Sequence, residues 1–165
     1  MALQRVAVIF DHKVRPDTTG IYCRRALGRL VEVEHFLPSE VSRIPRNRFD
    51  LFLNIDDGLR YRLPKELRPV AWWAIDTHLD LGWYLTKAPD FDFVFTAQRD
   101  GAANLRESGI DSATWLPLAC EPEIHRKHHV AKRFDLCFVG NLFPGPRTDL
   151  LEAVQKNFPG TFVSQ

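Results

Sequence analysis

Four short apolar segments, each followed directly by polar residues, limit the folds open to this chain. They are RVAVIF (5–10), FDLFLNI (49–55), PVAWWAI (69–75) and FDFVFTA (91–97). Apolar runs of this length, bounded by polar or turn residues, are typical of strands that are buried on both faces. We therefore expect these segments to be strands of one parallel sheet.

The segments between these runs complete an alternating pattern. Periodicity predicts helices over 21–30 and 99–108 and strands over 31–37 and 112–119, while 76–90 is interpreted as a polar loop. Strands that alternate with helices form a parallel sheet whose two faces are both covered. The expected fold class is therefore α/β, a Rossmann-like parallel sheet with helices on both faces.

Polar side chains gather where the four apolar runs end. The residues that follow the runs include Asp11, Asp56, Asp76 and Gln98. Open parallel sheets bind their ligands outside the carboxyl ends of the strands. We therefore expect these four residues to share one rim and to contact a ligand there.

Asp76 and His78 are the candidate catalytic residues, because they follow the most apolar of the runs. A carboxylate or an imidazole at a strand end is able to take a proton from a hydroxyl nucleophile when its surroundings tune its pKa. The alternative is that Asp76 caps a following helix, or that His78 is an ordinary surface residue.

Two further groups are candidate binding residues. Thr18, Thr19 and Gly20 form a small-residue turn before a predicted helix, where free N–H groups favour phosphate or sugar oxygens. The alternative is simple capping by Thr19, and no glycine-rich nucleotide motif supports the turn.

Gly140, Asn141 and Arg147 follow another apolar strand, FDLCFVGN, and lead into an amphipathic helix over 147–158. Arg147 is suited to bidentate binding of a phosphate. The alternative is an ion pair between Arg147 and a nearby acid, Asp149 or Glu152.

Composition excludes several classes of protein. The chain of 165 residues suits one domain or one domain plus the start of another, and its net charge of +1 disfavours a nucleic-acid binder. No apolar run approaches the roughly 18 to 20 residues that span a bilayer. The N-terminus has no cleavable signal, so we expect a cytoplasmic protein.

Residues 120–133, CEPEIHRKHHVAKR, are polar and lack periodicity, which is typical of a solvated linker. The segment is rich in Cys and His: Cys120, His125, His128 and His129. Their spacing matches no standard zinc site, so we expect no metal.

Several motifs resemble the CgeB-like glycosyltransferases of bacteria, which have the GT-B fold. In order, they are WW-x-x-D (Trp72, Trp73, Asp76), FDFVFTAQ, WLPLACEPEIH and FDLCFVGNLFPGPRTDLLEAV. The match runs over most of the chain, from about Phe49 to Val154, and the order of the motifs is more specific than any one of them.

The resemblance implies two Rossmann-like domains that face each other across a cleft. Residues 1–125 would form the N-terminal, acceptor-side domain, 126–133 a linker, and 134–165 the first β-α-β elements of a truncated, donor-side domain. The family's later donor-binding segment is missing, so we expect an incomplete chain that does not transfer sugar efficiently on its own. Its partners would be the missing half or a second copy of the chain.

The resemblance also implies the chemistry. A nucleotide-sugar donor acts as co-substrate, with no other cofactor, and Asp76, or His78 in its place, deprotonates an acceptor hydroxyl. Asp11 and Thr18–Gly20 would face the substrates, while Gly140, Asn141 and Arg147 would approach the donor phosphates. The donor, the acceptor and the stereochemical outcome stay open.

Two other functions compete with sugar transfer. One is a non-catalytic Rossmann-like module that binds a sugar, a nucleotide or a protein. The other is a relative of the flavodoxin-like response regulators, which is disfavoured because no paired acids follow the first strand together with a matching lysine at a later strand end.

Overall fold

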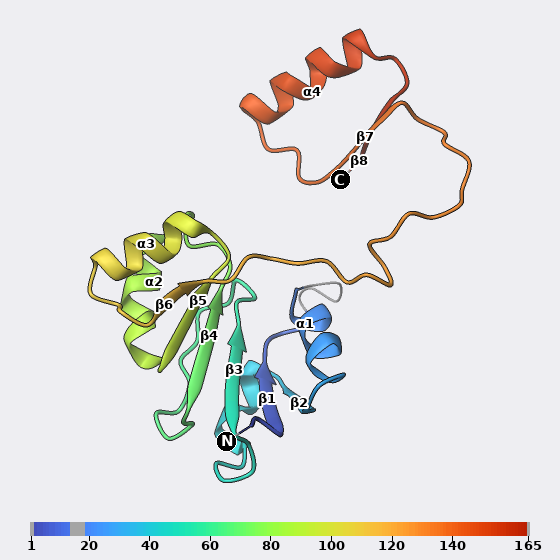
Figure 1. The fold of residues 1–165 in the computed structure, drawn as a ribbon. Coiled ribbons are helices and arrows are strands. Elements are labelled where there is room, and N and C mark those ends of the chain that lie inside the picture. The colour runs from blue at the N-terminus through green and yellow to red at the C-terminus, as the bar shows by residue number, and fades with distance from the viewer. Residues whose placement is uncertain (1, 14–18, 165) are drawn as a thin grey trace. The chain divides into compact units, whose positions relative to one another are not determined.

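The structure, a computed structural model, describes residues 2–13 and 19–164 (Figure 1). The chain forms two compact units, Met1–His125 and Arg126–Gln165.

The first unit is built on a six-stranded parallel sheet. Its strands are β1 (Arg5–Ile9), β2 (Glu32–Phe36), β3 (Leu51–Ile55), β4 (Val70–Ala74), β5 (Phe93–Thr96) and β6 (Ala113–Trp115), in the order β2-β1-β3-β4-β5-β6. Every neighbouring pair is parallel. All carboxyl ends therefore lie at one edge of the sheet, as the arrowheads in Figure 1 show.

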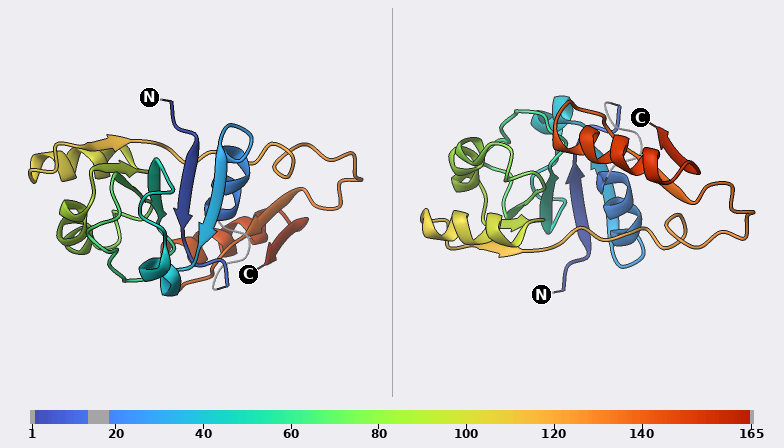
Figure 2. Two further views of the ribbon diagram at one scale, coloured as in Figure 1. Left: turned by 90° about the horizontal axis from the view of Figure 1, so that it is seen from below. Right: turned by 90° about the horizontal axis from the view of Figure 1, so that it is seen from above.

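Helices cover both faces of this sheet. Helix α1 (Thr19–Leu27) packs on the face that carries Val6, Val8 and Trp73. Helices α2 (Leu81–Lys87) and α3 (Arg99–Glu107) pack on the opposite face, and Figure 2 gives further views of this arrangement. The expected Rossmann-like α/β class is confirmed.

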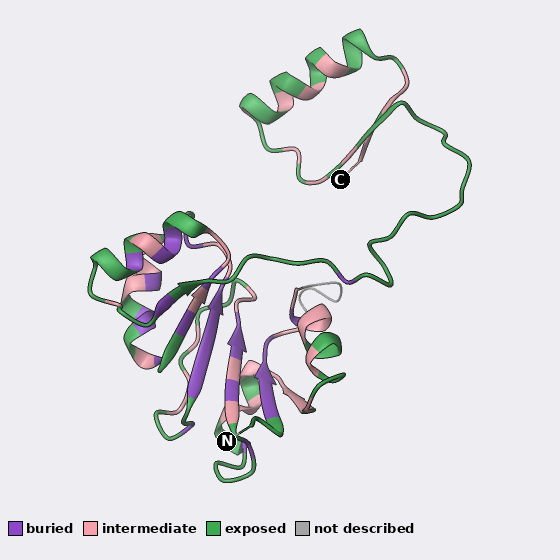
Figure 3. Ribbon diagram, viewed as in Figure 1, coloured by how far each residue is buried: buried purple, intermediate pink, exposed green. Residues whose placement is uncertain are grey.

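Strand β4 lies inside the sheet and is buried along its whole length (Figure 3). Because successive side chains of a strand point to opposite faces, the two tryptophans of β4 lie on opposite faces of the sheet. Trp72 stacks on Tyr84 with ring centroids 5.0 Å apart, and the Trp73 indole donates to the Leu116 carbonyl at 3.0 Å on the other side. The two rings join β4 to both helical layers.

The prediction of a polar loop over 76–90 is wrong, because helix α2 lies within it. Asp80 caps this helix by accepting a hydrogen bond from the Trp83 N–H at 3.2 Å. Leu81, Tyr84 and Leu85 then pack on the core. The helix has only seven residues, and a 3-10 turn, Ala88–Asp90, follows it at once, so its apolar period is too short to recognise in the sequence.

The other predicted elements exist with changed bounds. Helix α3 ends before Gly109, whose φ of +90° suits a glycine beyond a helix end. Strand β6 stops at Trp115, well short of the predicted end at 119. Pro117 lacks the N–H that a longer ladder would require. A further 3-10 helix, Pro38–Arg43, precedes β3.

The start of the predicted solvated linker instead belongs to the first unit. The Glu121 side chain is only 2% exposed and pairs with Arg29 of the loop after α1 at 3.2 Å. The interpretation of 120–133 as a wholly solvated segment is therefore wrong at Glu121. A contact between residues so far apart in sequence leaves no local pattern.

The second unit is a strand, a helix and a strand: β7 (Leu136–Val139), α4 (Pro146–Asn157) and β8 (Thr161–Ser164). The two strands pair in parallel. Helix α4 contains no buried residue, and of its expected apolar stripe Leu150 is 64% exposed (Figure 3). A two-stranded sheet with so little burial has marginal stability on its own.

Candidate functional site

The candidate site lies at the carboxyl edge of the six-stranded sheet. Four predicted site residues follow four adjacent strands there: Asp11 after β1, Asp56 after β3, Asp76 after β4 and Gln98 after β5. These residues differ in how many hydrogen bonds they already make within the protein. The most strongly bound of them hold neighbouring loops together, whereas one carboxylate keeps oxygens to which a ligand could bind.

Asp56 is engaged by protein donors on both carboxylate oxygens. Its Oδ2 accepts from the Tyr84 hydroxyl and from the Ile75 N–H at 3.2 Å, and its Oδ1 accepts from the Gly58 N–H at 3.1 Å. Burial raises the pKa of Tyr84, and the Asp56 carboxylate adds a smaller increase. The Tyr84 hydroxyl therefore stays protonated and donates the hydrogen bond. Asp56 therefore ties the loop after β3 to β4 and α2.

Asp57 joins the same loop to β1. Its Oδ2 accepts from the Asp11 N–H at 2.8 Å, and its Oδ1 accepts from the Leu59 N–H at 3.0 Å. Burial raises the pKa of Asp57, and the two N–H groups oppose that rise. The Asp11 carboxylate accepts from the Lys13 N–H at 2.7 Å.

A buried lysine lies beneath this edge. The Lys87 side chain is buried and donates to Asn54 Oδ1 at 3.0 Å, and its ammonium lies 4.5 Å from the Trp72 ring centroid. Burial lowers the pKa of Lys87 to about 8, against the pull of Asp56 and Asp57. Lys87 was not among the residues predicted from the sequence. The available signal was a lysine one turn after Tyr84 in an otherwise apolar segment.

Asp76 is the least engaged of the three carboxylates at these strand ends. The residue is half-buried, and its N–H donates to the Tyr84 hydroxyl at 3.3 Å. Within residues 2–13 and 19–164, no hydrogen bond or ion pair reaches its carboxylate. Asp76 does not cap α2, because Asp80 takes that role.

Thr77 and Gln98 fix the backbone that carries His78. Thr77 is buried, and its hydroxyl donates to Gln98 Oε1 at 3.1 Å. The Gln98 carbonyl in turn accepts from the Thr96 hydroxyl at 2.7 Å. His78 itself is exposed. Gln98 is thus a positioning residue for the loop after β4.

A cavity of ≈ 280 Å³ opens between this loop and the first turns of α3. Its lining residues are Thr77, His78, Leu81, Asp100, Gly101 and Asn104. Helix α3 approaches closely, because a Cβ atom on Gly101 would lie 2.2 Å from Thr77 Oγ1. Asp100 and Asn104 were not predicted, although their four-residue spacing at the start of a helix places them on one face.

The predicted turn before α1 is only partly described. Thr18 lies outside the described residues, and Thr19 is the first residue of α1. Gly20 is buried, and a Cβ atom there would lie 2.5 Å from the Phe10 ring. Close packing of α1 on β1 accounts for this glycine without a ligand.

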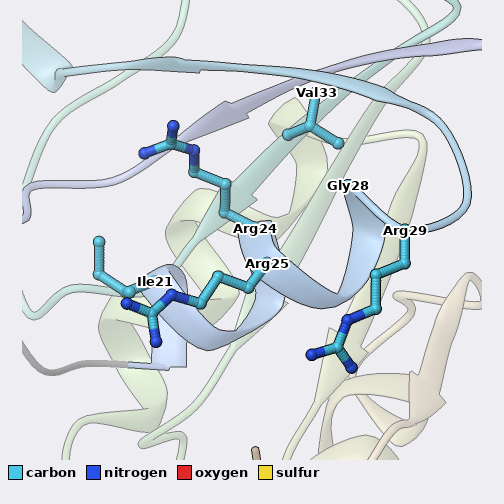
Figure 4. A pocket seen from close by; sticks show the side chains of 6 residues that line it. All are labelled: Ile21, Arg24, Arg25, Gly28, Arg29 and Val33. Carbon is cyan, nitrogen blue, oxygen red and sulfur yellow. The ribbon is translucent and has the colours of Figure 1, made fainter.

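A cavity of ≈ 470 Å³ between α1 and β2 is lined by three arginines, Arg24, Arg25 and Arg29, together with Val33 of β2 (Figure 4). Figure 4 shows their guanidinium groups pointing in different directions, and Arg29 is bound to Glu121 and Glu123. Charges that do not converge make a poor cradle for one anion.

Three predicted residues belong to the second unit. Arg147 lies in the first turn of α4 and donates from Nη1 to the Asn141 carbonyl at 3.0 Å, which places Gly140, Asn141 and Arg147 around one turn. The alternative pairing with Asp149 or Glu152 is absent among the described residues.

Two further properties concern the described part of the chain. No group of three or more His, Cys, Asp or Glu side chains there is placed to hold a metal ion. In residues 2–13 and 19–164, every helix is too short or too polar to cross a bilayer.

Comparisons with protein-family models, with curated proteins and with solved structures find no match to this chain. Function is therefore inferred from the side chains that each unit places together.

Proposed function

We propose that this chain is a glycosyltransferase of the GT-B type, in which the first unit binds the acceptor and the second contacts the nucleotide-sugar donor. One observation carries the proposal. Asp76 is a half-buried carboxylate at the carboxyl edge of a parallel sheet, and no described residue binds its oxygens. The order of the sequence motifs that resemble the CgeB-like family supports it.

Asp76 acts as the base of the transfer. Its carboxylate takes the proton of the acceptor hydroxyl while the hydroxyl oxygen bonds to the anomeric carbon of the sugar. The bond between that carbon and the diphosphate oxygen breaks, and the negative charge stays on the leaving nucleotide. The resemblance assigns the stabilisation of that charge to the donor-side residues, among them Arg147.

The cavity lined by Thr77 and His78, the residues that follow Asp76, suits a hydroxyl-rich ring. Thr77, His78, Asp100 and Asn104 supply donors and acceptors on its wall. A small number of polar groups in fixed positions is what gives a small-molecule site its specificity. Asp56 and Gln98 act indirectly, by holding the loops after β3 and β4.

The test is transfer by the purified full chain with a panel of nucleotide sugars and hydroxyl acceptors, with products identified by mass spectrometry. We expect Asp76→Asn to lower turnover by about 100-fold or more, which is the usual contribution of a general base. The matched control is Asp111→Asn, an exposed acid before β6, which should leave turnover unchanged. Product formation at equal rates in the native chain and in Asp76→Asn would contradict the proposal.

A non-catalytic sugar-binding module is the second candidate. The observation that favours it is that both oxygens of Asp56 and of Asp57 already accept protein hydrogen bonds, so these acids build the edge rather than react. Saturable binding of free sugars without any product would support this candidate over sugar transfer.

A further inference from the structure

The second unit begins with a strongly basic segment, residues 126–133, whose sequence is RKHHVAKR. Its cations are Arg126, Lys127, Lys132 and Arg133, and it contains no acid. Every residue of the segment is exposed (Figure 3). In residues 2–13 and 19–164, no carboxylate forms an ion pair with any of the four cations. The chain as a whole has a net charge of only +1, so the basic segment concentrates positive charge that its neighbours do not neutralise.

An exposed apolar face lies next to the basic segment. Phe134 follows the segment directly, and its ring stacks on Phe162 of β8 with centroids 4.7 Å apart. Cys137 pairs with Phe162 across the two strands, and Val139 lies two positions further along β7, so these side chains share one face of the sheet. Val139 is 71% exposed, Phe134 45% and Phe162 38%. We call Phe134, Cys137, Val139 and Phe162 the apolar face.

Unpaired cations beside exposed apolar side chains fit the surface of an anionic bilayer. Lys and Arg side chains bind the anionic headgroups, while apolar side chains next to them are buried where the headgroups meet the acyl chains. A nucleic acid would neutralise the cations, but it offers an aliphatic side chain such as Val139 no base to stack on. A protein partner needs a surface of fixed shape, and residues 126–133 contain no helix or strand that provides one.

We propose that the second unit binds the surface of anionic membranes through the basic segment and the apolar face. The four cations contact the charged headgroups, and Phe134, Val139 and Phe162 enter the headgroup region. Binding is peripheral and reversible, because a few charges and a few small apolar groups do not anchor a protein firmly. This property is independent of the proposed sugar transfer, since it uses none of the residues assigned to the acceptor or to the donor.

The test is co-sedimentation of the full chain with vesicles of phosphatidylcholine alone and with vesicles that contain about one third phosphatidylserine. We expect the protein to pellet with the anionic vesicles at low salt and to stay in the supernatant with the neutral ones. Because salt screens charges at an exposed surface, about 0.5 M NaCl should release the bound protein.

Two variants separate the charges from the apolar contact. Lys127→Gln combined with Lys132→Gln should lower the partition coefficient on anionic vesicles about 25-fold, since each basic residue near the surface contributes about fivefold. The matched control is Arg43→Gln combined with Lys65→Gln, which removes the same total charge from exposed positions of the first unit and should leave binding unchanged. Val139→Ser should weaken binding at least about threefold and preserve the dependence on salt.

All these changes are at exposed side chains, so circular dichroism should show native folding in each variant. Failure to pellet with anionic vesicles at low salt, equal binding to neutral vesicles, equal effects of the two double variants, or native affinity in Val139→Ser would overturn the proposal. So would tighter binding to a single-stranded oligonucleotide than to the vesicles, which would assign the basic segment to a nucleic acid. Self-association that the Lys127 and Lys132 double variant abolishes would assign it to a second copy of the chain instead.

Discussion

Lys87 shows how a single residue carries a charge into the core of the first unit. Its ammonium has a hydrogen bond to Asn54 and four aromatic rings around it: Tyr61, Trp72, Trp83 and Phe91. Rings and one amide oxygen replace only part of the lost hydration of a cation. Compared with the unfolded chain, the folded protein therefore makes the charged form of Lys87 less favourable, and the pKa of Lys87 falls to about 8.

This pKa predicts a pH dependence of stability. The ordinary pKa of a lysine side chain is 10.5, so between about pH 8 and 10.5 the unfolded chain binds more protons at Lys87 than the folded chain does. The free energy of unfolding therefore gains up to about 3 kcal/mol from this residue as pH rises through that window. Urea unfolding of the native chain and of Lys87→Met at several pH values measures the gain, which the variant should lack.

The comparison cancels other groups that titrate at high pH, such as Tyr61 and Tyr84, because both proteins contain them. The control is Lys65→Met, an exposed lysine that should leave the pH profile unchanged. A difference in unfolding free energy between native and Lys87→Met that stays constant with pH would contradict the prediction.

Among the secondary-structure elements, α3 lies unusually close to the loop after β4. The contact is between Gly101 in its first turn and the Thr77 hydroxyl, which is itself held by Gln98. This approach sets one wall of the polar cavity that Thr77 and His78 also line. The position of the helix thus depends on the lack of a side chain at one residue.

Gly101→Ala should lower the free energy of unfolding by about 1–3 kcal/mol, because the added methyl group overlaps Thr77 Oγ1. Helix propensity alone predicts the opposite sign, since alanine favours helix over glycine. Gly82→Ala in α2 is the matched control: the nearest atom to its new Cβ would be Asp80 Oδ1 at 3.6 Å, an ordinary contact, so this change should stabilise. Chemical denaturation compares the two, and equal effects would refute the steric explanation.

On the scale of the whole molecule, the two units differ in how they bury apolar surface. Both hydrophobic clusters of the described chain consist of residues from the first unit. In the second unit, large apolar side chains such as Val139, Phe143 and Phe158 are more than half exposed. The stability of the first unit should therefore not depend on the second.

A chain that ends after His125 should unfold cooperatively, with a melting temperature within a few degrees of the first transition of the full chain. A chain that ends after Ala119 should melt lower, because it loses the buried Glu121 side chain and its ion pair with the half-exposed Arg29. Circular dichroism melts measure both. Loss of cooperative unfolding in the longer fragment would show that its core is not self-contained.

The sequence by itself determined the strands, the parallel α/β class and the rim where Asp11, Asp56, Asp76 and Gln98 follow adjacent strands. These features follow from local periodicity and from the rule that crossover-connected strands run in parallel, so neighbouring residues are enough to reveal them.

Only the tertiary structure decided which polar groups are already used. The bonds of Asn54 to Lys87, of Tyr84 to Asp56 and of Arg29 to Glu121 join residues that are 33, 28 and 92 positions apart. Whether a carboxylate is bound or open depends on donors brought to it by distant segments. For that reason the sequence placed Asp56 and Asp76 on one rim without showing which of them is already bound, and the fold separates them.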